Sequence, residues 1–214
     1  MQSLSPAIHL FQNKYIYTKN KNKETHDTTT INSIIGNTEH LATVALYAED
    51  EIDFNDKIKA NIGLRYVMFG VKDKIYPSIE PRLSMRYLIA EHQSIKVSYA
   101  RMAQAIHMLS NSDLISPSDI WVPITDKIPP MKSDQWALGY NSEPEPGIEF
   151  SVEGYYKTMD NLLEYKDGAS YLTSRQKWDN IVAMGKGRSY GVELYAQKDI
   201  GETTGWISYT WSRS

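Results

Sequence analysis

The stretch WALGYNSEPEPGIEFSVEGYYK, residues 136–157, alternates apolar and polar side chains on both sides of a short central segment. Successive side chains of a β-strand point to opposite faces, so a period of two gives each strand one apolar and one polar face. The central segment SEPEPG (142–147) is rich in residues that favour turns. The stretch therefore predicts an antiparallel β-hairpin. Its apolar face carries Trp136, Leu138, Tyr140, Ile148, Phe150 and Val152, and its polar face carries Gln135, Ala137, Gly139, Asn141, Glu149, Ser151 and Glu153.

The same alternation recurs along the whole chain. Many of the 15 tyrosines lie inside or at the ends of the alternating runs, where an amphipathic ring suits a boundary between apolar and aqueous surroundings. The pattern predicts an all-β fold, an antiparallel up-and-down meander of about nine long strands. We expect these strands near residues 7–17, 41–51, 56–69, 79–89, 93–101, 133–142, 147–158, 187–199 and 204–212.

The connections between the predicted strands alternate between short and long. The short ones contain the Asp, Asn, Gly and Pro residues that tight turns favour. Short turns on one side of a sheet and long loops on the other are typical of outer-membrane β-barrels. The short turns are 52–56, 90–93, 142–147 and 200–205; the longer links are 18–40, 70–78, 102–132 and 159–186.

One predicted strand, KIKANIGLRYVMFG (57–70), is long enough to distinguish a membrane wall from a soluble sheet. Its apolar parity extends over about 11 residues, which matches a tilted bilayer crossing, whereas strands of soluble sheets usually have about five or six. Its other parity is too polar for the core of a sandwich and suits a wet lumen. The apolar parity is Ile58, Ala60, Ile62, Leu64, Tyr66 and Met68; the polar parity is Lys57, Lys59, Asn61, Gly63 and Arg65.

Composition excludes several other classes of protein. The net charge of -3, with no marked Lys/Arg cluster, argues against a protein that binds nucleic acid. The chain has no cysteine, which rules out disulfides, thiolate metal sites and a cysteine nucleophile. The chain contains no run of 18 apolar residues, so no membrane-spanning helix is predicted. The first residues, MQSLSPAIHLFQNK (1–14), lack the features of a secretory signal.

Seven segments, in order, resemble the β-barrel of TonB-dependent outer-membrane receptors, in particular the receptors of Bacteroidetes. No single motif among them is specific, and it is their order and spacing that carries the resemblance, over roughly residues 7–214. The segments are LYAEDEIDFNDKIKANIGLRY (46–66), PSIEPRLSMRYLI (77–89), SIKVSYAR (94–101), DIWVP (119–123), WALGY (136–140), EGYYKTMDNLLEY (153–165) and GRSYGVELYAQKDIGETTGWISYTWS (187–212).

The resemblance implies a barrel of about 22 strands with a plugged lumen, in the outer membrane of a Gram-negative bacterium. Such a receptor imports a nutrient of the siderophore, vitamin, peptide or glycan class, with energy passed through TonB. The implied partners are outer-membrane lipid, TonB through a plug region, and a small nutrient, with no cofactor, no metal and no catalysis. The sequence lacks a plug, and nine strands are too few to close the barrel. We therefore expect residues 1–214 to be a partial barrel, from a natural truncation or an incomplete reading frame.

Ligand contacts are expected in the long outer loops 18–40, 102–132 and 159–186, because loops on a rigid scaffold commonly carry binding residues. Exposed aromatic rings there could stack on sugars or on apolar faces of a ligand. This reasoning selects Trp121, Tyr165 and Trp178. The alternative is that these rings pack the loops against each other.

Two other functions stay open on the residues alone. One is a self-standing β-rich module that recognises a glycan or a protein through its long loops. The other is a glycan-active enzyme that uses Glu149 and Glu153, which lie four apart on one strand face. A pair of catalytic carboxylates also needs a suitable separation and one raised pKa, so residues that line a polar lumen are the preferred interpretation.

Overall fold

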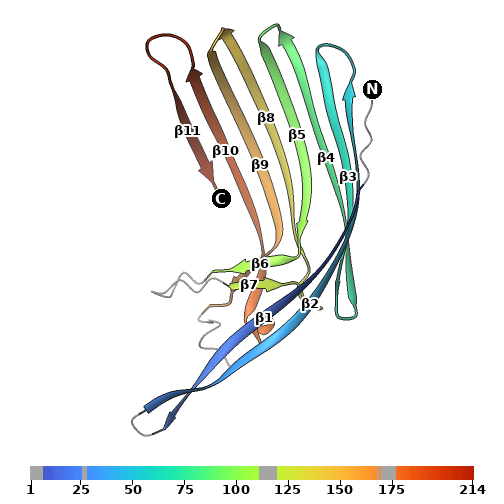
Figure 1. Cartoon of the computed structure of the whole chain (residues 1–214), viewed down its shortest axis with the longest axis vertical. Helices are drawn as coiled ribbons and strands as arrows, with labels where there is room; N and C mark the ends of the chain where they lie inside the picture. The colour runs from blue at the N-terminus through green and yellow to red at the C-terminus, as the bar shows by residue number, and fades with distance from the viewer. Residues whose placement is uncertain (1–6, 26–27, 111–119, 168, 170–176) are drawn as a thin grey trace.

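The computed structural model describes residues 7–25, 28–110, 120–167, 169 and 177–214. Nine strands of these residues form one antiparallel sheet in the order β1-β2-β3-β4-β5-β8-β9-β10-β11, and two short strands, β6 and β7, form a second sheet (Figure 1). The predicted all-β meander of nine strands is confirmed. The strands are β1 Ala7–Thr25, β2 Thr28–Asp53, β3 Ile58–Val71, β4 Lys74–Ala90, β5 Gln93–Gln104, β6 Ile106–Leu109, β7 Ile120–Pro123, β8 Met131–Glu145, β9 Ile148–Tyr165, β10 Val182–Lys198 and β11 Gly205–Arg213.

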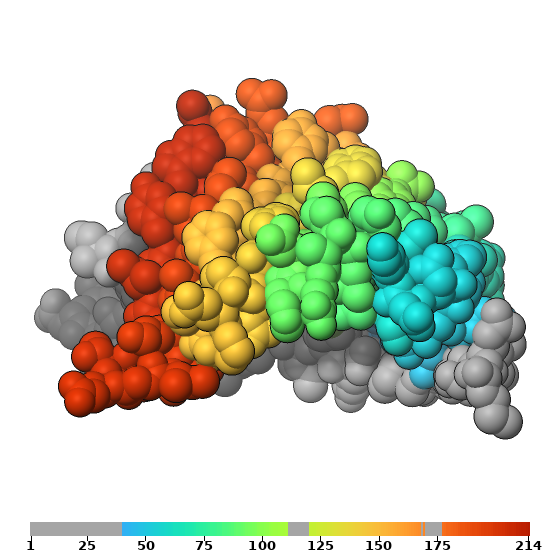
Figure 2. All heavy atoms as spheres, turned by 90° about the horizontal axis from the view of Figure 1, so that it is seen from above, coloured from blue at the N-terminus to red at the C-terminus, as the bar shows by residue number. Residues whose placement is uncertain are grey.

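The large sheet has one apolar and one polar face, as the alternation predicts. We call the face that carries Ile62, Tyr99 and Leu138 the apolar face, and the face that carries Arg65 and Glu153 the polar face. Figure 2 shows the sheet bent into an arc with aromatic rings on its convex side. Bulky apolar side chains stay exposed on the apolar face, among them Leu46, Ile62, Leu64, Leu83, Met85, Val97, Leu138, Phe150, Val192 and Leu194.

Tight turns join the strands at one end of the sheet (Figure 1). Between β2 and β3, the Asn55 side-chain oxygen accepts hydrogen bonds from the backbone N–H groups of Lys57 and Ile58 at 2.9 and 2.8 Å. Between β8 and β9, Gly147 has a φ of 78°, a left-handed conformation that glycine adopts without steric cost. Local hydrogen bonds and glycine therefore reverse the chain within a few residues, as the sequence predicts for this end.

The predicted long links are wrong in their extent. Residues 18–40 are strand on both sides of residues 26–27, and the link at 70–78 is a turn at Lys72 and Asp73. The links at 102–132 and 159–186 shorten because β5, β8, β9 and β10 continue beyond the predicted ends. The reason is that a strand in water needs no strict apolar alternation, and runs such as TTTINSII (28–35) are rich in β-branched residues with high strand propensity.

A β-bulge interrupts the pairing of β9 with β10. Leu162 pairs with Gly185 and Asp160 pairs with Lys186, so Asn161 is the extra residue. Asn161 has a φ of 61°, and its side-chain amide donates a hydrogen bond of 2.9 Å to the Pro130 carbonyl. Asparagine tolerates the left-handed conformation better than most residues. The bulge therefore redirects the end of β9 and ties it to the start of β8.

Within the part of the chain that the structure describes, no helix is long and apolar enough to cross a membrane. The one helical turn described is η1, Trp178–Asn180, between β9 and β10.

We predict that Asn161→Val lowers the free energy of unfolding by about 1–2 kcal/mol relative to Asn161→Gly, because a β-branched residue is strained at positive φ. Both variants lose the hydrogen bond to Pro130, so the difference between them isolates the backbone conformation. Urea denaturation in detergent, followed by tryptophan fluorescence, measures this difference. Equal midpoints for the two variants would contradict the assignment of strain to this residue.

Candidate functional site

Strands β4 and β5 pair over only part of their lengths. The last pair between them is Arg82 with Ala100, whereas β5 continues to pair with β8 as far as Gln104. The first half of β4 therefore has no partner on this side. Pro77 and Pro81 both lie in that half, and a proline, which lacks the N–H of a sheet ladder, fits where no neighbour accepts one. The separation of the strands starts the segment 105–130, which connects β5 to β8.

A buried carboxylate joins three strands at the point of separation. Glu80 of β4 is 1% exposed. One of its oxygens accepts a hydrogen bond of 2.9 Å from the Arg65 guanidinium of β3. The other accepts the backbone N–H of Ala103 of β5 at 3.1 Å. Glu80 thus supplies to β5 a hydrogen-bond acceptor in place of the backbone carbonyl that β4 no longer offers. Both carboxylate oxygens of Glu80 accept a hydrogen bond, which offsets the free-energy cost of burying its charge. We call this group the Glu80 clasp.

The segment after β5 folds back across the polar face of β2 and β3. The Ala105 carbonyl accepts the Ile124 N–H at 2.9 Å, and these two residues share a buried cluster with the sheet. A polar face that is charged at mid-sheet is therefore apolar at this end, where the returning segment covers it. The buried members of the cluster are Leu41, Ala45, Val67, Phe69, Val71, Ala105 and Ile124.

Polar contacts hold the same segment to the turn between β3 and β4. The Tyr76 hydroxyl donates to the Thr125 carbonyl at 2.8 Å, and the Lys74 ammonium donates to the Asp126 carbonyl at 2.8 Å. Lys72 lies 3.5 Å from the Asp126 carboxylate. The pKa of that carboxyl is lowered, first by a hydrogen bond from its own backbone N–H and then by the ammonium of Lys72. Residues 125 and 126 are thus attached to the start of β4 and to the turn before it.

The β6–β7 hairpin has one buried and one exposed side. His107 pairs with Val122, and these side chains are 3% and 0% exposed. Met108 pairs with Trp121, and these are 49% and 57% exposed. The buried side belongs to a second cluster, which joins the hairpin to η1 and to the ends of β9 and β10. Its buried members are Leu109, Val122, Ile128, Trp178 and Val182, with Ile120, Leu163 and Tyr165 packed against them.

The structure separates the three aromatic residues that the sequence selects for ligand contact. Trp121 is exposed on β7. Beside it lies Met108, a residue that was not among the three selected from the sequence. Trp178 is 7% exposed and Tyr165 packs against the same cluster. Those two rings help to pack the connections against each other, Trp178 as a buried member of the cluster and Tyr165 as a partly buried one, and ligand contact by either of them stays a prediction. The period-two alternation of HMLS (107–110) and IWVP (120–123) is the signal that could have identified the exposed pair.

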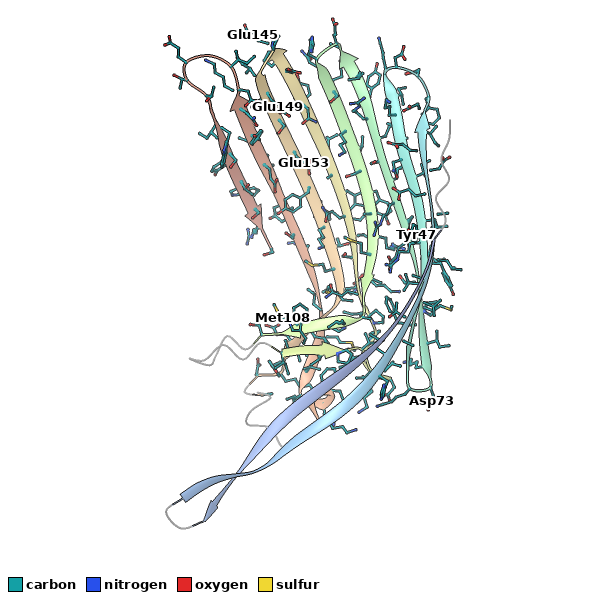
Figure 3. All side chains as sticks on the ribbon, in the orientation of Figure 1. Tyr47, Asp73, Met108, Glu145, Glu149 and Glu153 are labelled. Atoms are coloured by element: carbon teal, nitrogen blue, oxygen red, sulfur yellow. The ribbon has the colours of Figure 1, made fainter. Side chains whose placement is uncertain are left out.

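The polar face above this hairpin carries a column of acidic side chains. Figure 3 shows Glu149 and Glu153 along β9, with Glu145 at the end of β8. Glu153 lies directly opposite Glu193 of β10, and both are exposed. Like charges in this arrangement destabilise a sheet unless a cation lies near them. No group of three His, Asp or Glu side chains in the described ranges could hold a metal ion.

A shallow hollow of about 270 Å³ lies beside β3 on the sheet. It is open because Gly63 has no side chain, and Tyr47, Glu49, Arg65 and Arg82 surround it. Figure 3 labels Tyr47 at this position on β2. The hollow therefore offers the charged and hydroxyl groups of Glu49, Arg65, Arg82 and Tyr47 at mid-sheet.

Removal of the Glu80 carboxylate should loosen the connection after β5. Glu80→Ala leaves the Ala103 N–H and the Arg65 guanidinium without their acceptor, at a cost of about 1–3 kcal/mol for a buried unpaired group. Because Arg65 is partly exposed, its share of this cost is reduced. We expect faster amide hydrogen exchange at 103–109 and 120–128. Glu49→Ala, which removes one exposed hydrogen bond from Asn61, is the matched control. Unchanged exchange in the Glu80 variant would show that the apolar cluster alone holds the segment.

His107 generates a prediction of pH dependence. Burial lowers the pKa of His107 below 6.5, opposed in part by a hydrogen bond to the Pro129 carbonyl, and its Nε2 atom has no hydrogen-bond partner. The unfolded hairpin therefore binds a proton more readily than the folded one, so stability is fully present above about pH 6.5 and falls below it.

We expect amide hydrogen exchange at residues 105–109 to become faster below about pH 6.5 than in a His107→Gln variant at the same pH, because the variant has no titrating imidazole at this position. His92→Gln, in the exposed turn between β4 and β5, is the control. If the two histidine variants behave alike, the buried imidazole does not control the hairpin.

Comparison with known proteins places this geometry in a family. Residues 8–214 match the family described as TonB dependent receptor-like, beta-barrel. Among solved structures, the ferric enterobactin receptor PfeA from Pseudomonas aeruginosa aligns with a TM-score of 0.65 at 15% identity, over 98% of this chain and 33% of that one. The FrpB iron transporter from Neisseria meningitidis aligns with a TM-score of 0.61 at 16% identity, over 83% of this chain and 26% of that one.

A third structure, the alcaligin outer-membrane receptor FauA from Bordetella pertussis, aligns with a TM-score of 0.53 at 13% identity, over 98% of this chain and 40% of that one. The chain thus spans less than half the length of each of these structures. No match was found among curated protein sequences. The family match covers nearly the whole chain, and the two-faced antiparallel sheet agrees with it. The chain belongs to the β-barrel family of TonB-dependent receptors, which are proteins of the bacterial outer membrane.

Proposed function

We propose that this chain forms part of the wall of a TonB-dependent importer and part of the structure that closes its outer end. The observation that carries the proposal is that residues 105–106 and 124, from both sides of the connection after β5, pack across the polar face. A wall with an apolar outer face and a polar inner face only separates lipid from water. A segment that is fixed across the inner face at one end also controls what enters the lumen.

The proposal includes a nutrient ligand that meets the β6–β7 hairpin. An iron–siderophore complex is the favoured class, because the solved structures that resemble this chain are described as a ferric enterobactin receptor, an iron transporter and an alcaligin receptor. The support on the chain itself is the exposed pair Met108 and Trp121. An apolar, polarisable surface of this kind suits the face of a flat, partly aromatic ligand. We propose no catalytic role for any residue of the chain.

The family membership also implies coupling to TonB through a plug region, and we propose that the acidic column of the polar face lies toward the lumen that such a plug occupies. The alternative of a self-standing binding module is not favoured. Its outer surface would have to be polar, whereas the apolar face of this sheet exposes bulky apolar side chains on strand after strand.

The test is uptake of iron–siderophore complexes by cells that depend on the full-length receptor. We expect Trp121→Ala to weaken the affinity for the imported complex by about ten-fold, from the loss of one stacking contact. Phe54→Ala, which removes a ring that is 61% exposed in the turn at the opposite end, is the matched control. Unchanged affinity and uptake in the Trp121 variant would exclude this hairpin as the ligand contact. Normal growth of cells without the receptor on every iron source, with growth defects on another nutrient, would exclude the iron class.

A further inference from the structure

The apolar face is grooved where β8, β9 and β10 lie side by side. Gly154 of β9 has no side chain, and a Cβ atom at this position would have only the Gly191 carbonyl oxygen near it, at 3.9 Å. Leu138 and Val192 lie directly across the neighbouring strands from it. The resulting groove has a volume of about 460 Å³, and its lining includes Val97, Trp136, Leu138, Gly154, Tyr156 and Val192.

A row of aromatic rings bounds the groove on the side of the long connections. The rings of Tyr99 and Trp136 lie 5.4 Å apart, those of Trp136 and Tyr156 6.2 Å, and those of Tyr156 and Tyr190 6.4 Å. The four residues are also direct partners across β5, β8, β9 and β10. Tyrosine and tryptophan rings favour the boundary between hydrocarbon and headgroups, so this row sets the depth of the groove within the membrane.

Two rows of charged residues follow on the same face, immediately beyond the aromatic row. The first row runs from Arg101 through Asp134 to Arg188, with Thr158 between the last two. Arg101 is paired with Asp134 at 2.8 Å. Thr158 separates Arg188 from this pair, so Arg188 is exposed and has no acidic neighbour in the first row.

The second row consists of Lys132, Asp160 and Lys186, which are direct partners across β8, β9 and β10. Lys186 is paired with Asp160 at 3.1 Å, and Lys132 lies exposed on the other side of Asp160. Two acids in these rows thus face four cations, and both acids already have a partner. The surface beyond the aromatic row therefore has an excess of positive charge, carried chiefly by Lys132 and Arg188.

We propose that the groove and the two charged rows form one binding site for an anionic membrane lipid. An acyl chain lies in the groove at Gly154, and a phosphate headgroup lies against Arg188 and Lys132. The spacing fits, because four residues of strand separate Gly154 from the first charged row, or about 13 Å. The lipid lies in the membrane leaflet nearest to the end of the sheet that carries the long connections between strands.

Charge and shape together select this occupant. A zwitterionic lipid would fill the groove equally well but would gain nothing from the excess cations, whereas each cation near an anionic headgroup contributes a favourable interaction. A second copy of the protein would bring the same cations against each other. The proposal needs the apolar face to meet lipid, which membership of the family provides, and it is independent of the nutrient that the receptor imports.

The test uses the full-length receptor in detergent micelles that contain brominated lipids, which quench nearby tryptophans such as Trp136. We expect brominated phosphatidic acid to bind more tightly than brominated phosphatidylcholine. Lys132→Gln with Arg188→Gln should lower this preference by about five-fold for each cation removed. Arg82→Gln with Lys96→Gln, which removes two cations from the polar face, is the matched control and should leave the preference unchanged.

A second variant tests the groove without changing any charge. Gly154→Leu fills the space and should weaken the binding of both lipids to a similar extent, while folding is checked by resistance to urea. Equal binding of the two lipids to the unaltered receptor would overturn the proposal. So would displacement of phosphatidic acid by inorganic phosphate at the same ionic strength, which would show a site for phosphate alone, or a dimer that forms through this face and excludes lipid.

Discussion

A sheet that faces hydrocarbon must satisfy its backbone hydrogen bonds within the protein, because lipid offers no donor or acceptor in place of water. This constraint explains the long ladders of the meander, such as those of β3 with β4 and of β9 with β10. Pairing fixes the register, and the register fixes which residues share a face. The segregation of apolar from charged side chains, the aromatic row and the charged rows beyond it all depend on this pairing.

Where the backbone pairing of β4 with β5 stops, the Ala103 N–H needs another acceptor, and Glu80 provides it. Strand β4 continues for several residues after β5 has left it, and the carboxylate of Glu80 takes the place of a missing backbone acceptor. The same carboxylate holds Arg65, so the departure of β5 is tied to the charged part of the polar face. Ala105 and Ile124 of the connection after β5 then pack on the apolar end of that face, at Val67, Phe69 and Val71. One local loss of pairing thus produces the covered end on which the proposed function rests.

The alternation of residues was sufficient to predict the strands inside the membrane, because there the two faces meet two different solvents. It was insufficient beyond the membrane, where both faces meet water and strand formation depends on propensity. Residues 18–40, predicted to be a loop between two strands, are therefore strand on both sides of residues 26–27. The same limit applies to the candidate site. Trp121 and Trp178 are equally aromatic and lie in comparable connections, yet one is exposed and the other is 7% exposed. Their difference comes from contacts between segments that are distant in sequence.

The sequence by itself determined the all-β meander, its two unlike faces and its family, since these follow from the order of side chains along each strand. The tertiary structure alone decided that the connection after β5 returns over the polar face, that His107 and Trp178 are buried, and that a groove lies beside an excess of cations. The physical reason is that alternation describes one strand at a time. Grooves, clusters and charged rows are instead created by the register between strands, which brings Gly154, Leu138 and Val192 together.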